Sequence, residues 1–270
     1  MPEPDSQALI DAATAYEAIF VPALFQEWAD RVAQAAHLSP GKRVLDVACG
    51  TGVLARAAAA RVAPAGAVVG VDANPGMLTV AARITPAIEW RQAPAEALPF
   101  PDQAFDAVVS QFGLMFFADR QTALNEMVRV LRPDGRLAVA VWDTLEHTPA
   151  YATEVELVER HASPTAAAPL RSPFSLGALP ELSALFATTG LRDVQIKTYP
   201  GRARFPSIHA MVEADLRGWL PLMGVKLDGT TIDTILVAAE TALQSYVTSS
   251  GSVEFVAPAH IVTAMRRRGS

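Results

Sequence analysis

The segment RVLDVACGTGVLA, residues 43–55, constrains this chain more than any other stretch. Residues 43–48 are mostly aliphatic and β-branched, which is typical of a buried parallel strand. Gly50 and Gly52 follow directly, and the alanine-rich residues 54–62 favour a helix. A strand that turns on glycines into a helix leaves free backbone N–H groups at the carboxyl end of the strand. Open α/β sheets bind their ligands at such a point.

A second apolar strand is predicted over residues 67–72, and it ends in Asp72. A carboxylate about 20 residues beyond the glycines is placed to accept hydrogen bonds from the hydroxyls of a ribose. The two features together predict a nucleoside-containing cofactor in the first half of the chain. The pattern Gly50-x-Gly52-x-x-Ala55 also fits a dinucleotide such as NAD, so spacing leaves the nucleoside open.

Four separated motifs give a more specific indication. They are DVACGTG (46–52), VVGVDANPGML (68–78), EALPFPDQAFDAVVSQFGLMFF (96–117) and RVLRPDGRLAV (129–139). In order and spacing this set resembles the class I S-adenosylmethionine (SAM)-dependent methyltransferases. The resemblance is to the small-molecule branch that includes the ubiquinone/menaquinone biosynthesis C-methyltransferases and the type 11 enzymes. It covers residues 40–142 and implies direct in-line (SN2) transfer of a methyl group from SAM to a small-molecule acceptor, with S-adenosylhomocysteine as product.

The resemblance also implies a set of cofactor contacts. Gly50 and Gly52 let the backbone approach the methionyl part of SAM. Asp72 binds the ribose, while Ala73 and Met77 flank the adenine ring. The full set of expected cofactor-binding residues is Asp46, Ala48, Gly50, Gly52, Asp72, Ala73, Met77, Ala95, Glu96, Ser110 and Gln111.

Acceptor contacts and a base are harder to predict. The acceptor-binding candidates are Tyr16, Phe20, Phe112, Met115 and His209. His147 follows the predicted fifth strand and is the candidate catalytic base, because imidazole titrates near neutrality. His37, His161 and His260 are expected at the surface. Cys49 is expected to pack as a small apolar thiol, and no Cys/His spacing predicts a metal site.

Alternating strands and helices predict an α/β fold, a Rossmann-like doubly wound sheet that is mostly parallel. A C-terminal antiparallel strand and helical cap segments complete it. The expected strands of the first half cover residues 43–48, 67–72, 87–92, 105–110 and 136–142. We expect one domain over residues 1–270, made of N-terminal helices (1–40), a SAM-binding core (41–142), a lid-like segment (143–190) and the last two strands (191–270), with a helical insertion at 206–250.

Composition narrows the classes of partner. The 270 residues carry a formal net charge of −6 and a pI of about 5.4, which disfavours a nucleic-acid substrate. No apolar stretch approaches the roughly 18 residues of a membrane span, so no membrane partner is expected. A single cysteine, and an N-terminus without a signal segment, predict a cytoplasmic protein. Arg266–Arg268 is interpreted as a solvated tail. The oligomeric state is left open.

Two other functions stay open on this evidence. A nicotinamide-dependent oxidoreductase would use the same glycine pattern, but no tyrosine has a lysine four residues on, as a Tyr-x-x-x-Lys pair requires. A non-catalytic protein that binds SAM or S-adenosylhomocysteine would need no base.

One departure from the family pattern concerns adenine recognition. Family members often read D-A-E-A-L-P-F where this chain reads PAEALPF, so Pro94 takes the place of the first acid. Proline offers neither a carboxylate nor an N–H. Adenine recognition then rests on the Ala95 N–H, on Glu96 or on water.

Pro94→Asp is expected to strengthen SAM binding by about 1–2 kcal/mol, because it restores one hydrogen bond to the adenine amino group. Isothermal titration calorimetry on both proteins measures the difference. An unchanged dissociation constant would contradict the assignment.

Overall fold

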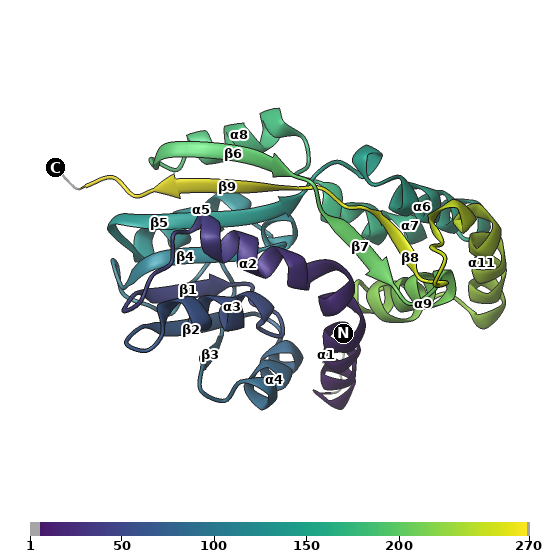
Figure 1. The fold of residues 1–270 in the computed structure, drawn as a ribbon, viewed down its shortest axis with the longest axis horizontal. Helices are drawn as coiled ribbons and strands as arrows, with labels where there is room; N and C mark the ends of the chain where they lie inside the picture. The colour runs from purple at the N-terminus through teal and green to yellow at the C-terminus, as the bar shows by residue number, and fades with distance from the viewer. Residues whose placement is uncertain (1–5, 269–270) are drawn as a thin grey trace.

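The computed structural model describes residues 6–268 and contains a seven-stranded sheet in the order β3-β2-β1-β4-β5-β9-β6 (Figure 1). Its strands are β1 (Arg43–Val47), β2 (Ala67–Asp72), β3 (Glu89–Gln92), β4 (Phe105–Gln111), β5 (Leu131–Trp142), β6 (Arg192–Tyr199) and β9 (Ala259–Met265). Strands β1 to β5 are parallel, and β9 runs antiparallel to both β5 and β6. The predicted Rossmann-like sheet with a C-terminal antiparallel strand is confirmed.

Helices cover both faces of this sheet. Helix α2 (Gln26–Ala35) packs on α3 (Val53–Val62), β4 and β5, and α4 (Pro75–Ile84) packs on β2 and β3. Helix α5 (Arg120–Val130) packs on β5 and on α8 (Leu179–Ala187). Because parallel strands between two helical layers meet no solvent, the central strands are nearly all apolar.

A cap lies beyond the carboxyl ends of the parallel strands, at the right of Figure 1. Its main elements are α6 (Pro149–His161), α7 (Pro164–Arg171), α9 (Ile208–Glu213), the π-helix η5 (Ala214–Trp219), α11 (Gly229–Ala242), β7 (Arg202–Phe205) and β8 (Val253–Val256). Short helical turns complete the chain: η2 (Leu114–Phe116), η3 (Leu145–His147), η4 (Ser172–Phe174), α10 (Leu220–Leu222) and η6 (Gln244–Tyr246).

The two C-terminal strand segments differ from the expectation of one simple pair. Only their outer parts, β6 and β9, join the main sheet, while β7 and β8 form a separate two-stranded sheet in the cap. Prolines at positions 200 and 258 interrupt both segments at the same level. There the Ala257 N–H donates to the Gly201 carbonyl at 2.9 Å. The two segments β6–β7 and β8–β9 thus run from the main sheet into the cap, where β7 and β8 form the small sheet.

The N-terminal helices form one bent helical run through α1 (Ser6–Phe20), the π-helix η1 (Val21–Phe25) and α2. Among the described residues, this run from residue 6 to 35 is long and apolar enough to span a membrane by length and composition. The expectation that no such stretch exists is therefore wrong. The apolarity has a second explanation, because Trp28 and Val32 are completely buried in the core.

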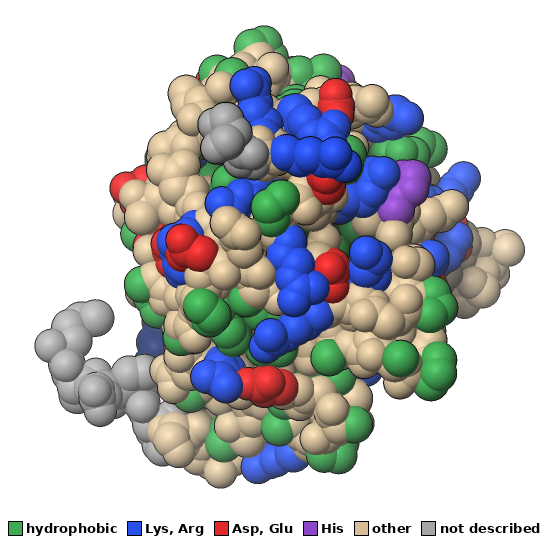
Figure 2. Space-filling model, turned by 90° about the vertical axis from the view of Figure 1, so that its left-hand side faces the viewer, with side chains coloured by type: hydrophobic (Ala, Val, Ile, Leu, Met, Phe, Trp, Pro, Cys, Tyr) green, Lys and Arg blue, Asp and Glu red, His purple; other side chains and the backbone are tan. Residues whose placement is uncertain are grey.

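Basic side chains gather on the face at the amino ends of the parallel strands, interspersed with acidic ones (Figure 2). Arg266 donates to the Arg129 carbonyl at 2.8 Å, and Arg268 pairs with Asp134. The interpretation of Arg266–Arg268 as a solvated tail is therefore wrong for Arg266, whereas the Arg268 side chain is 83% exposed, as predicted. The reason is topological, since β9 lies inside the sheet and carries the end of the chain along β5.

The turn between β6 and β7 packs on α2 through a residue without a side chain. A Cβ atom on Gly201 would lie 2.2 Å from the Trp28 ring and 2.5 Å from the Ala257 carbonyl oxygen. We expect Gly201→Ala to lower the free energy of unfolding by about 1–3 kcal/mol, because a buried indole must move. Urea denaturation measures this loss.

Gly229→Ala is the matched control, because a Cβ atom at Gly229 meets open space at the start of α11. Its stability is expected to stay within about 1 kcal/mol of the wild type. Equal losses in both variants would show that the contact with Trp28 is not the cause.

Candidate functional site

The turns that follow β1 and β4 lie side by side, because these strands are neighbours at the point where the strand order reverses. Both turns hold a non-glycine residue in the left-handed region, Ala48 with φ 56° and Phe112 with φ 56°. A Cβ atom on Gly113 would lie 2.5 Å from the Ala48 Cβ, so the two turns pack tightly. Left-handed non-glycine residues are strained and cluster at functional sites.

Asp72 is held in place by the two adjacent turns. Its Oδ2 accepts the Gly50 N–H and its Oδ1 accepts the Asn74 N–H, both at 2.8 Å. Gly50 has a φ of 54°, which turns its N–H toward the end of β2. Burial raises the pKa of Asp72, and the N–H donors partly oppose that shift. The carboxylate is thus fixed at the edge of the glycine turn.

Asp46 places a second carboxyl group near the glycine turn. It is fully buried on β1, and neither oxygen makes a well-formed hydrogen bond within residues 6–268. Burial, followed by the nearby Asp72 charge, raises its pKa well above the ordinary range. The nearest guanidinium, Arg56, is bound to Glu17 and to the Thr51 carbonyl, both at 2.8 Å. Two carboxyl groups near the glycine turn disfavour the pyrophosphate of a dinucleotide.

The other expected cofactor contacts have different surroundings. Ser110, at the end of β4, is buried with an unpartnered hydroxyl. The Gln111 amide donates to the Phe25 carbonyl at 3.0 Å, which ties β4 to the N-terminal helices. Glu96 accepts the Asp119 N–H at 3.2 Å. Ala95 is buried, whereas Ala73 is exposed and Met77 half-buried beside the first turn of α4.

Gly52 has a structural role that the sequence pattern does not reveal. Its φ is 90°, and a Cβ atom there would lie 2.4 Å from the Trp90 ring. A Cβ atom added to Gly70 would also lie 2.4 Å from this ring, so Trp90 packs closely against both glycines. Cys49 is buried beside them, and burial raises the pKa of its thiol well above the usual value. The prediction of a small packed thiol is confirmed.

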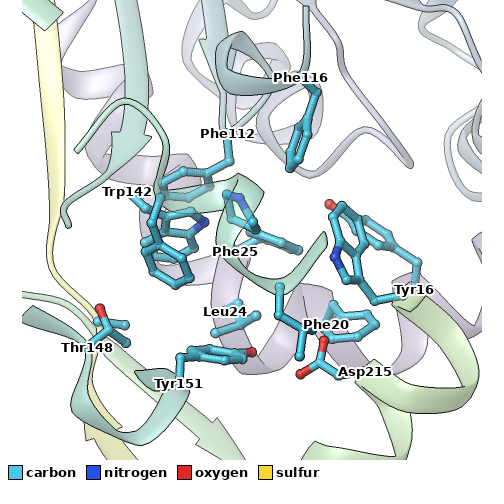
Figure 3. Close-up of a pocket in the computed structure, with 15 residues that line it drawn as sticks. Tyr16, Phe20, Leu24, Phe25, Phe112, Phe116, Trp142, Thr148, Tyr151 and Asp215 are labelled. Carbon is cyan, nitrogen blue, oxygen red and sulfur yellow. The ribbon is translucent and has the colours of Figure 1, made fainter. Parts of the chain in front are cut away.

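A cavity of about 700 Å³, including its mouth, separates the sheet from the cap (Figure 3). Most of its wall is aromatic, and among the described residues that line it only Asp215 is charged. The lining consists of Tyr16, Phe20, Leu24, Phe25, Phe112, Phe116, Trp142, Thr148, Tyr151, Leu170, Pro173, Phe174, Asp215, Trp219 and Ala257. Of the predicted acceptor contacts, the cavity therefore includes Tyr16, Phe20 and Phe112, but not Met115 or His209.

Aromatic stacking builds the wall on the sheet side. Phe112 and Trp142, from the ends of β4 and β5, stack at 3.8 Å and 5°. Trp28 stands edge-on to both rings, and Phe25 packs beside them. Tyr16 stacks on Phe25 at 5.3 Å and also contacts the glycine turn, because its hydroxyl lies 3.9 Å from a Cβ atom on Gly50. Tyr16 therefore contacts both the cavity and the glycine turn.

Comparison with known proteins agrees with this geometry. The family described as "Methyltransferase domain" matches residues 45–139. The ubiquinone/menaquinone biosynthesis C-methyltransferase UbiE of Geobacter sulfurreducens is 40% identical over 129 residues, 44% of this chain and 49% of that protein. The demethylmenaquinone methyltransferase of Thermus thermophilus is 47% identical over 116 residues, 42% of this chain and 52% of that protein. Residues 45–139, from β1 into β5, are thus similar to a methyltransferase domain.

The chain spans about half the length of the curated relatives it matches. Solved structures extend the likeness of fold to most of the chain. The YcgJ protein from Bacillus subtilis superposes with a TM-score of 0.60 at 21% identity, covering 90% of this chain and 99% of that one. Phosphoethanolamine N-methyltransferase 2 of Haemonchus contortus gives 0.61 at 18% identity, covering 95% and 57%.

None of the five histidines lies among the residues that line the cavity. The His147 side chain is 63% exposed, and its Nδ1 lies 2.9 Å from Asp143, so its position does not support a role as base. His209 is also largely exposed and pairs with Glu213 at 3.5 Å. His37 and His161 are exposed, as predicted.

The expectation that His260 is at the surface is wrong. His260 is 1% exposed, because β9 is an interior strand of the sheet and is covered on both faces. Its Nδ1 lies 2.8 Å from the Thr198 hydroxyl, and its Nε2 lies 2.9 Å from the Gly177 carbonyl oxygen. These contacts tie β9 to β6 and to the loop before α8, so the residue has a structural role.

Two acids of the cap escaped the sequence interpretation. Asp215 on η5 is 4% exposed, and Glu154 on α6 is completely buried. Burial raises the pKa of Asp215 to about 8, while burial and the Asp215 charge raise the pKa of Glu154. A sequence signal exists, since each acid interrupts an apolar stripe at helical spacing: Tyr151, Glu154, Val155 and Val158, and Val212, Asp215, Leu216 and Trp219.

Asp215 is expected to make stability fall with pH. Its folded-state pKa of about 8 exceeds the value of roughly 3.9 for an unfolded aspartate. The stability contributed by the protonated form is thus complete below about pH 4 and is lost as the pH rises to about 8. Asp215→Asn should therefore gain stability relative to the wild type between pH 5 and pH 8, by at most roughly 1.4 kcal/mol per pH unit.

Urea unfolding at both pH values measures this gain. Asp233→Asn is the control, because the Asp233 side chain is 74% exposed and should give the same difference at each pH. An equal effect of Asp215→Asn at pH 5 and pH 8 would contradict the raised pKa.

Proposed function

We propose that the whole chain catalyses transfer of the SAM methyl group to a small, ring-bearing apolar acceptor held in the aromatic cavity. The observation that carries the proposal is the direct contact between the glycine turn after β1 and the aromatic cavity. Tyr16 lines the cavity and lies against the Gly50 turn, and Phe112 lines the cavity from the turn after β4. Donor and acceptor would then meet at a single point.

The residues around the cleft fit the chemistry of SAM. SAM supplies a methyl group on a positively charged sulfonium, so the protein needs no nucleophile of its own. Asp72 provides a hydrogen-bonded carboxylate beside the glycine turn and stands where a ribose acceptor is expected. Burial and the Asp72 charge raise the pKa of Tyr16, so its hydroxyl stays protonated and able to donate. Positioning of the two reactants then supplies much of the rate enhancement.

The acceptor is proposed from the cavity and from the relatives. Stacked rings of Phe112 and Trp142 suit a flat apolar molecule. The two relatives named above are methyltransferases of ubiquinone and menaquinone biosynthesis by name, which favours a ring-bearing acceptor. The matched region ends near residue 139, before the cap begins, so a different ring compound fits equally well.

Two further points belong to the proposal. Core and cap would act as one unit, because both line the same cavity. The protein would work in the cytoplasm, where its buried free thiol at Cys49 stays reduced.

Asp72→Asn tests the proposed cofactor role. Loss of a charged acceptor should weaken SAM binding by about 1.5–3 kcal/mol, roughly 10- to 150-fold. Isothermal titration calorimetry measures the affinity, and methyl-labelled SAM with a panel of phenols, quinols and aromatic amines measures transfer. Asp30→Asn, whose side chain is 72% exposed, should behave as the wild type.

An Asp72→Asn protein that binds SAM like its parent would refute the role of this carboxylate. Wild-type protein that binds SAM but labels no compound in the panel would favour a non-catalytic binding protein.

A further inference from the structure

The cap end of the aromatic cavity carries an acid pair that the proposed methyl transfer does not use. Asp215 projects from η5 into the cavity, next to Tyr151 and Phe20, at the end opposite Phe112 and Phe116 (Figure 3). Its Oδ2 is buried and lacks a hydrogen-bond partner in the described residues. The position depends on a π-helical turn, a distortion often found at functional sites.

Glu154 lies behind Asp215, on α6. It has no exposed surface, and neither of its carboxyl oxygens has a partner in the part of the chain that the structure describes. The two carboxyl groups act on each other and on the phenol of Tyr151. Two adjacent buried carboxyl groups cannot both ionise without a compensating positive charge.

The residues from 6 to 268 supply no such charge. Arg217, on the same π-helix as Asp215, pairs with Glu213 at 3.2 Å and with Asp233 at 3.8 Å. Over residues 6–268, no Lys, Arg or His forms an ion pair with Asp215 or Glu154. The charge that would satisfy the acid pair must therefore come from outside the chain, either as a proton or as a ligand.

The walls of the cavity select the kind of ligand. Aromatic faces attract a cation through their ring quadrupoles, and a carboxylate in an apolar site binds a charged donor more strongly than a neutral one. An anionic group would meet both the acid pair and the ring faces unfavourably. A neutral hydroxyl would hydrogen-bond to Asp215 but would leave the charge of the pair uncompensated. An ammonium group on an apolar ring compound matches every part of this end of the cavity.

We propose that Asp215, supported by Glu154, anchors a basic nitrogen of the acceptor, so that the cavity takes a hydrophobic amine. The inference rests on the proposed function only where it identifies the bound amine as the methyl acceptor. The amine-binding site itself does not depend on methyl transfer. When an ammonium binds, the acid pair releases one proton to solvent and the remaining carboxylate faces the cation. Asp215 is thus a positioning residue that orients the ring toward Phe112, Trp142 and the cofactor cleft.

The test compares two probes of nearly the same shape, 2-(2-naphthyl)ethylamine and 2-(2-naphthyl)ethanol, without SAM. Isothermal titration calorimetry at pH 7.5 should show the amine binding at least tenfold tighter than the alcohol in the wild type. Repeating the amine titration in buffers of different ionisation heat should show release of about one proton. Asp215→Asn should abolish both the preference and the proton release, and Glu154→Gln should reduce them.

Asp233→Asn is the matched control, since it changes an exposed acid of the cap and should keep the preference. Equal binding of the two probes to the wild type, binding of neither, or a preference that survives Asp215→Asn would overturn the proposal. If Asp215→Asn does not fold, the proposal is tested by Glu154→Gln and by the number of protons that the wild type releases. An unchanged preference in Glu154→Gln together with no proton release from the wild type would then overturn it. Because these titrations omit SAM, a negative result for amine binding does not affect the test of SAM binding at Asp72. A negative result at Asp72 likewise leaves the amine titrations interpretable.

Discussion

The hydrogen bond from the Gly50 N–H to Asp72 is the constraint on which the site depends. It forms because β1 and β2 run parallel in register, Val47 beside Val71, and because Gly50 takes a positive φ that a side chain would strain. The bond ties the turn after one strand to the acid at the end of the next. The other residues expected to bind the cofactor are arranged around that junction.

Charge gives the two ends of the site a common character. Asp46 and Asp72 flank the glycine turn, and Glu154 and Asp215 lie at the far end of the aromatic cavity. Asp46, Glu154 and Asp215 are buried and Asp72 is half-buried, in surroundings where a charge costs far more than in water. Each pair is therefore satisfied best by a positive group from a ligand. The stacked rings between them exclude water and strengthen both interactions.

Local sequence patterns predict the core well and the cap poorly. Strands β1 to β5 could be placed because aliphatic runs, glycine turns and Asp72 each act over a few residues. His260 and Arg266 were misjudged because their burial depends on β9 entering the sheet beside β5, a contact between distant segments. Asp215 was missed because an acid that interrupts an apolar helical stripe signals burial but not what the acid faces. Only the folded cap shows that this acid faces a cavity.

The central claim is that the glycine turn and Asp72 together hold the methyl donor. A crystal structure of the protein with SAM tests it most directly. We expect the ribose hydroxyls within hydrogen-bonding distance of the Asp72 carboxylate and the sulfonium methyl directed into the aromatic cavity. Density for SAM elsewhere on the molecule, with Tyr16 still packed against the Gly50 turn, would contradict the claim.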